Sequence, residues 1–249
     1  MSARRVNARW TAAGLTLAGM VATPLSARGG SVRRTLASAV VGGAALTTAL
    51  NAASRWGVRR VVGAASILGV GMTAVERIGT TTGLPFGRYR YTGRLRPEIV
   101  GVPAIVPLAW WAMAVPSREA AHAALGPRSA PVVRIGLGAL ALTAWDLFLD
   151  PQMTGEGYWR WERRGIYRGI PLTNYIGWLV TSAAVMAVLE QLLPAREPDG
   201  ALVAEYAAMG VMETVGFAAF FRDRVVAVVG AIGMLPVAAA ATWAVVRRD

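Results

Sequence analysis

The stretch PVVRIGLGALALTAWDLFLDP, residues 131 to 151, decides the fold class of this chain. It is apolar on all sides, whereas a half-buried strand alternates and a surface helix is apolar on one side only. A bilayer core of about 30 Å needs about 20 such residues in a helix. Inside hydrocarbon only helices and closed barrels satisfy the backbone, and a continuous run of this length selects the helix. We therefore predict a membrane-spanning helix over Pro131–Leu149.

Similar apolar runs lie on both sides of it. They predict spans at Trp10–Leu25, Thr35–Ser54, Val58–Val75, Ile99–Val115, Leu172–Leu193, Leu202–Phe221 and Val225–Val246. The first run is short and follows Arg4, Arg5 and Arg9, as a secretory signal does, but the many later spans favour a first membrane helix. We expect an all-α, polytopic integral membrane protein with seven to eight transmembrane helices, in which residues 1–249 form a single membrane domain.

The composition agrees with a membrane protein and excludes several kinds of site. The chain of 249 residues is 55% hydrophobic and 16% charged, outside the usual balance of a soluble domain. All 26 basic residues are arginine, scattered in short clusters without a continuous basic face, so we predict no nucleic-acid partner. With no cysteine and one histidine, His122, we expect no disulfide, no metal site and no Ser-His-Asp triad. The chemistry must come from carboxylates, hydroxyls, arginines and aromatic rings.

Two polar connections stand apart from the apolar runs. Residues 77–98 contain GTTTGLPFGRYRY (79–91), and residues 150–171 read DPQMTGEGYWRWERRGIYRGIP. Two predicted spans separate them, so both loops lie on the same membrane face and can share a site. A small excess of arginine on that face favours the cytoplasmic side of a prokaryotic plasma membrane. The glycines at 79, 83 and 87 match no phosphate-binding fingerprint and are expected to permit tight turns.

A carboxylate within or beside a span is expected to have a structural or functional role, since inserting a charge at the helix centre costs about 2.5–3.5 kcal/mol of free energy. Asp146 and Asp150 are four residues apart and share one helix face. Two like charges in a low dielectric leave one carboxyl group protonated beside one ionised group, which makes a general acid and base pair. Alternatively, Asp150 ends the helix before Pro151 while Asp146 pairs with a loop arginine.

The other carboxylates and the aromatic residues also divide between chemistry and structure. We expect Glu213 to face the bundle interior and Glu190 to reach the interface without a chemical role. Near span ends, an interfacial belt is predicted for Trp110, Trp111 and Trp178. The aromatic residues of the loop at 150–171 share it with four arginines. Their rings can stabilise a carbocation or contact a flat polyene, although an interfacial helix explains them equally well.

Three blocks carry a resemblance to a known family. They are ERIGTTTGLPFGRYRYTGRLRPEIVGVP (76–103), AWDLFLDPQM (144–153), and GYWRW followed by YRGIPLTNYIGW (167–178). Together they cover about a fifth of the chain and resemble the carotenoid biosynthesis membrane proteins typified by the CruF-type carotenoid hydratases. The resemblance implies hydration of the terminal double bond of an acyclic carotenoid to a tertiary alcohol, without a cofactor. The implied partners are a lipophilic carotenoid within the bilayer, membrane lipid and other carotenoid pathway enzymes.

The candidate site residues follow from motif position and from the cost of burying charge. Asp146 or Asp150 is the candidate acid, and its partner or Glu76 holds the water. The other candidates contact the cation, the substrate or the water: Tyr91, Trp159, Trp161, Phe86, Asn174 and Thr82. Two other classes stay open. A magnesium-dependent carotenoid prenyltransferase or elongase would use the single DLFLD motif, although such enzymes usually have two Asp-rich motifs. A transporter or lipid-binding protein would use the same carboxylates, but no internal repeat is found.

Overall fold

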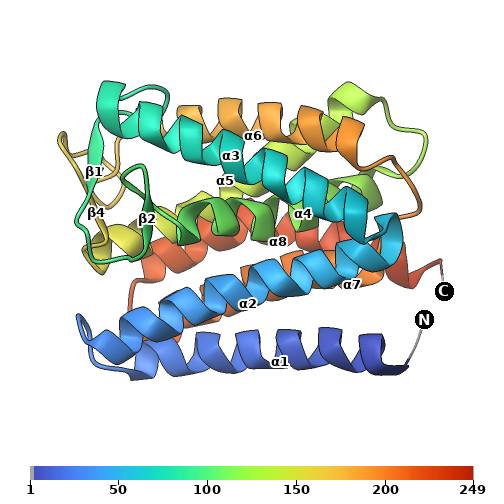
Figure 1. Cartoon of the computed structure of the whole chain (residues 1–249), viewed down its shortest axis with the longest axis horizontal. Helices are drawn as coiled ribbons and strands as arrows, with labels where there is room; N and C mark the ends of the chain where they lie inside the picture. Colours follow the sequence, from blue (N-terminus) through green and yellow to red (C-terminus); the bar gives the residue numbers. More distant parts are fainter. Residues whose placement is uncertain (1–2, 249) are drawn as a thin grey trace.

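The fold was analysed in a computed structural model that describes residues 3–248. In this part of the chain eight helices run up and down along the long axis of the molecule, with four short strands at one end (Figure 1). The helices are α1 Ala3–Leu25, α2 Ser31–Trp56, α3 Val58–Thr82, α4 Ile105–Leu125, α5 Pro131–Gly155, α6 Leu172–Leu192, α7 Gly200–Val215 and α8 Arg224–Val246; a π-helical turn, η1, covers Gly216–Phe220. The strands are β1 Tyr89–Tyr91, β2 Glu98–Ile99, β3 Val102–Pro103 and β4 Trp159–Trp161. The predicted all-α membrane fold is confirmed.

Six of the helical segments are long and apolar enough to cross a membrane: α2, α3, α5, α6, α7 with η1, and α8. Within residues 3–248, α1 and α4 fall below that criterion. The second half of α4 contains Arg118, Glu119 and His122, all buried. This helix packs against α2, α3, α5, α6, α7 and α8, so its charged side chains meet protein partners and not lipid. Helix α1 packs along α2, where Arg9 donates a hydrogen bond of 2.9 Å to Ser54; the side chains of Arg4 and Arg5 lie outside the described residues.

The predicted boundaries of α4 are wrong by several residues. The segment expected to begin this span, from Ile99, instead forms the β2–β3 hairpin, in which Glu98 faces Pro103 and Ile99 faces Val102. Val100 and Gly101 at its turn both have positive φ angles, which a helix cannot contain. The helix therefore starts only at Ile105.

Helix α5 does not end at Asp150, because it continues through Pro151 to Gly155. A proline inside a helix leaves the carbonyl four residues earlier without its N–H donor. That carbonyl belongs to Leu147, and the hydroxyl of Tyr167 donates to it at 3.0 Å. The loop after α5 thus supplies the missing hydrogen bond, and Asp150 keeps its place on the helix face below Asp146.

Glycines allow close helix contacts in some of the spans but not in others. A side chain at Gly138 of α5 would meet Met186 of α6, and one at Gly233 of α8 would meet Leu147. Around Gly69 and Gly71 of α3, by contrast, nothing lies within 4 Å of the Cβ position. The small residues of α5 and α8 therefore bring helices together, whereas those of α3 do not.

Strands β1 and β4 join the two polar loops. They pair antiparallel, with Tyr89 opposite Trp161 and Tyr91 opposite Trp159. Because side chains alternate along a strand, the four aromatic rings share one face, while Arg90 and Arg160 point the other way and are exposed. The paired strands form a cap over one end of the bundle, opposite the end where the chain starts and finishes (Figure 1).

Candidate active site

The aromatic face of the β1–β4 cap points into the bundle. Tyr89 and Trp161 lie 5.1 Å apart between ring centroids, and Tyr91 meets Trp159 edge to face at 5.9 Å. Burial raises the pKa of the Tyr89 and Tyr91 hydroxyls, and the nearby Glu76 raises it further. Both hydroxyls therefore remain protonated donors well above neutral pH.

Glu76, near the end of α3, receives three hydrogen bonds. Tyr89 and Tyr91 donate to Oε2, the latter at 2.7 Å, and the indole of Trp110 donates to Oε1 at 3.1 Å. The side chain is buried. Three donors on one carboxyl group fix its orientation. Glu76 thus places a held carboxyl group directly under the aromatic cap.

Asp146 and Asp150 meet a single amide group. Asn174, in the first turn of α6, donates through Nδ2 to Oδ2 of Asp146 at 2.8 Å and also to Oδ2 of Asp150. Trp159 donates to Oδ1 of Asp150 at 3.0 Å. Asp146 is fully buried, its Oδ1 has no protein partner, and within residues 3–248 it forms no ion pair with an arginine. The alternative that Asp146 pairs with a loop arginine is therefore wrong.

These groups surround one cavity between α3, α4, α5, α6 and the cap. Seven of the nine predicted site residues line it: Glu76, Phe86, Tyr91, Asp150, Trp159, Trp161 and Asn174. Asp146 lies behind Asn174 and reaches the cavity only through that amide. A cavity lined by the carboxyl groups of Glu76 and Asp150, with Asp146 behind them and aromatic walls, can protonate an apolar double bond and shelter the resulting cation.

Thr82 is placed differently from our expectation. It is exposed on the last turn of α3, where its hydroxyl donates to the carbonyl of Ile78 at 2.8 Å and accepts from the amide of Leu84 at 3.1 Å. The helix extends four residues into the GTTTG motif and ends at Gly83, which adopts the left-handed conformation. Thr82 therefore belongs to the helix end, and the prediction that it faces the site is wrong.

Sequence reasoning missed several aromatic wall residues. Trp110 and Trp178 stack with centroids 4.0 Å apart and ring planes 14° apart, and both are buried against the cavity. Trp111 is also buried. The prediction of an interfacial belt for these three is wrong, because all three side chains are buried within the protein. Tyr89, Trp145 and Tyr158 also line the cavity and were not predicted as site residues, although Tyr89 lies two residues before Tyr91 and so shares its strand face.

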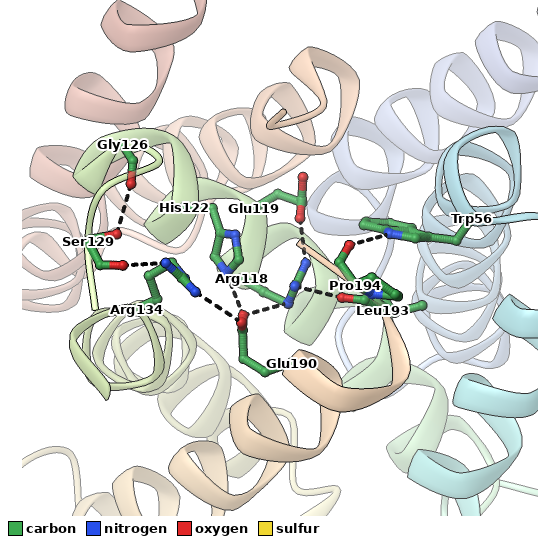
Figure 2. Close-up of polar contacts among 10 residues, drawn as sticks. All are labelled: Trp56, Arg118, Glu119, His122, Gly126, Ser129, Arg134, Glu190, Leu193 and Pro194. Carbon is green, nitrogen blue, oxygen red and sulfur yellow. Dashed lines mark hydrogen bonds and ion pairs between the residues drawn. The ribbon is translucent and has the colours of Figure 1, made fainter. Parts of the chain in front are cut away.

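A second polar cluster lies at the opposite end of the bundle. Figure 2 shows Arg118, His122 and Arg134 converging on Glu190. Arg118 is 3.0 Å from Glu190, 2.8 Å from Glu119 and donates to the carbonyl of Leu193 at 2.8 Å. The sequence predicted that Glu190 reaches the membrane interface, and this prediction is wrong. Its ion pairs instead connect α6 to α4 and α5. The basic groups and the carboxylates of this cluster are paired with one another, which is the arrangement of a structural cluster.

Two other carboxylates within the bundle have different surroundings: one is hydrogen-bonded to a neighbouring helix and the other lines a cavity. Glu205 of α7 accepts from Thr48 at 2.6 Å and from Asn51, and so connects α7 to α2. Glu213 lies further along α7 and lines an apolar cavity beneath α1. This position agrees with the prediction that Glu213 faces the bundle interior. Among residues 3–248 no group of three or more histidine, aspartate or glutamate side chains is arranged to hold a metal ion.

Comparison with known proteins gives two matches. A profile of the family described as carotenoid biosynthesis protein matches residues 35–246. The chain is also 30% identical over 118 residues to a bisanhydrobacterioruberin hydratase from Haloarcula japonica. That alignment covers 47% of this chain and 40% of the relative, so less than half of the relative is matched. No solved structure matches the chain.

Proposed function

Because this chain belongs to the carotenoid biosynthesis protein family, we propose that it adds water to the terminal double bond of an acyclic carotenoid and leaves a tertiary alcohol. The partial match to a hydratase supports this reaction. The observation that carries it is the Asp146–Asn174–Asp150 group, which is buried at the end of an aromatic cavity and has one carboxyl group facing that cavity.

The reaction needs an acid, a sheltered cation and a water molecule. Two adjacent buried carboxyl groups repel each other when both are ionised, so the pair holds one proton between them. Asp150 faces the cavity and delivers this proton to the less substituted alkene carbon. The electron pair of the double bond forms the new C–H bond and leaves a tertiary cation. Water adds to that cation, and its surplus proton returns to the carboxylate pair.

The surroundings of Asp150 suit the cationic intermediate. Glu76 is held by three donors and lines the same cavity, so its negative charge attracts the cation without being free to form a bond with it. The indoles of Trp110, Trp159 and Trp178 line the same space, where an aromatic ring adds cation-π attraction. No hydride or electron is transferred in these steps, so the reaction as proposed needs no redox cofactor.

The decisive experiment is expression of the chain in a lycopene-producing bacterial host, followed by mass analysis of the extracted pigments. A mass gain of one or two water molecules supports hydration. A gain of a prenyl unit, dependent on magnesium and a prenyl diphosphate, would instead establish a prenyltransferase. Unchanged pigment in the presence of inserted protein, with several acyclic carotenoids, would contradict both reactions and favour a binding or transport role.

A further inference from the structure

Three cavities follow one another through the bundle and share walls. The active-site cavity and the second cavity have six lining residues in common: Ala37, Val41, Ala109, Trp145, Leu149 and Met153. The second and the third cavity also share residues, among them Met20, Ala44 and Met113. We call the second and third cavities together the α1 groove, since residues of α1 line both. The groove therefore adjoins the active-site cavity along this shared wall.

The α1 groove is long. Ala37 lines its first part and Asn51 its far part, and these residues are fourteen positions apart on α2. At the helical rise of roughly 1.5 Å per residue this separation is about 21 Å. Helix α1 gives a similar length, because Pro24 and Arg9 line opposite ends of the groove. A groove of this shape fits an extended chain and not a compact molecule.

The walls of the groove are mostly apolar and adaptable. Five of the nine methionines of the chain contribute to its first part: Met20, Met113, Met153, Met209 and Met212. Methionine side chains are flexible and polarisable, and they suit contacts with an extended conjugated ligand. The polar exceptions are Thr23, Gln152 and Glu213 on the first part, and Arg9, Thr16, Thr47 and the Glu205–Asn51 pair on the far part.

Helix α1 forms the outer wall of the groove. It packs along α2 and, near its C-terminal end, against η1, while α7 forms the opposite wall over a floor of α2 and α4. The family profile begins at residue 35, so α1 lies before the matched segment. The groove wall facing the outside is thus made by a helix separate from the segment that carries the active site.

We propose that the α1 groove binds the polyene chain of the substrate, with the reacting end of that chain in the aromatic cavity. The inference rests on the proposed function for the identity of the ligand, and on the shared cavity walls for its position. The polyene enters sideways from lipid, between α1 and α7. The active site therefore needs no water-filled opening wide enough for the substrate.

A bulky side chain in the groove tests this proposal. Ala44 lines both parts of the groove, and Leu46, two residues later, is exposed on the outside of α2. In a lycopene-producing host we expect Ala44→Trp to lower both the lycopene that purifies with the protein and the hydrated product by about tenfold or more. Leu46→Trp, the matched control, should retain both. Ala208→Trp places the same obstruction on the α7 wall and should repeat the loss.

The outcomes separate the groove from the reaction. Lycopene that purifies in wild-type amounts with both Ala44→Trp and Ala208→Trp overturns the groove, even if hydration proceeds. Lycopene that binds the wild type and is lost in these variants, but is never hydrated, supports the groove and overturns the proposed reaction. Size-exclusion profiles identify any variant that does not fold. The wild type supplies a readout independent of mutation, since lycopene held in the groove gives induced visible circular dichroism, and its absence contradicts the proposal.

Discussion

At the scale of single residues, the amide of Asn174 explains how two aspartates can share one buried helix face. One Nδ2 group donates to both carboxyl groups, and the indole of Trp159 fixes the outer one. The spacing of Asp146 and Asp150 predicted their common face from sequence alone. It could not show which of them faces the substrate, because that depends on where α6 and β4 place their donors.

The two aspartates should therefore differ in their contribution to the rate. We expect Asp150→Asn to lower hydration by about a hundredfold or more, because the proton donor facing the alkene is lost. Asp146→Asn should have a smaller effect, since Asp146 acts through Asn174. Pigment analysis of membranes containing equal amounts of each protein measures both. Equal losses, or full activity of Asp150→Asn, would contradict the assignment of Asp150 as the acid.

Glu76 should act through its charge. Glu76→Gln keeps the shape of the side chain but removes the negative charge facing the cation, and we expect a loss of about tenfold to a thousandfold in turnover. Tyr91→Phe removes one of its three donors and should cost less. Initial rates of product formation at equal lycopene content compare them. A Glu76→Gln protein as active as the wild type would show that the charge has no part in the reaction.

At the scale of secondary structure, the polar loops move helix ends away from the positions that the apolar runs predict. The bounds of α6 and α8 were predictable from hydropathy to within one residue, because lipid imposes the length of a span, whereas α1, α2 and α3 extend beyond the predicted apolar runs. The start of α4 and the end of α5 were not predictable. The β2–β3 hairpin displaces the start of α4. Tyr167 allows α5 to continue past Pro151, because its hydroxyl replaces the hydrogen bond that Pro151 cannot make. Such compensation is made by residues distant in sequence.

The Tyr167 hydrogen bond can be measured by a double-mutant cycle. Burial raises the pKa of Tyr167 to about 12, so the hydroxyl is a donor at neutral pH. Tyr167→Phe leaves the carbonyl of Leu147 without a partner and should destabilise the protein by about 1 kcal/mol. In a Pro151→Ala background the new backbone N–H satisfies that carbonyl, so the same substitution should cost less. Thermal unfolding in detergent gives the four stabilities; equal costs in both backgrounds would contradict this account.

At the scale of the whole molecule, polar groups lie at both ends of the bundle with different tasks. The end under the cap has carboxyl groups with neutral donors around them, whereas the other end has arginines and carboxylates already neutralised by each other. Sequence could predict the overall helical bundle and the meeting of the two loops. It did not predict the second cluster, since Arg118 and Glu190 lie on different helices with no shared motif.

The cluster around Glu190 should support stability and not turnover. Removing one partner from a buried ion pair costs about 3–5 kcal/mol, so Arg118→Ala should lower the melting temperature in detergent markedly. The exposed Arg163 provides a matched control, and Arg163→Ala should leave the melting temperature unchanged. Protein of the Arg118→Ala variant that remains folded should hydrate with unchanged product composition. Altered products at unchanged stability would give this cluster a functional role.

The shared amide of Asn174 also has a consequence for the order of synthesis. A ribosome makes Asp146 and Asp150 before Asn174 exists, so α5 must enter the lipid while its two acidic side chains lack the donor they finally share. At about 5–20 residues per second the interval before α6 follows is short but not negligible. The proton that is proposed to reach the alkene would also reduce the negative charge on α5 while the translocon releases this helix into the bilayer. Catalytic chemistry and membrane biogenesis thus make the same demand on one pair of carboxyl groups.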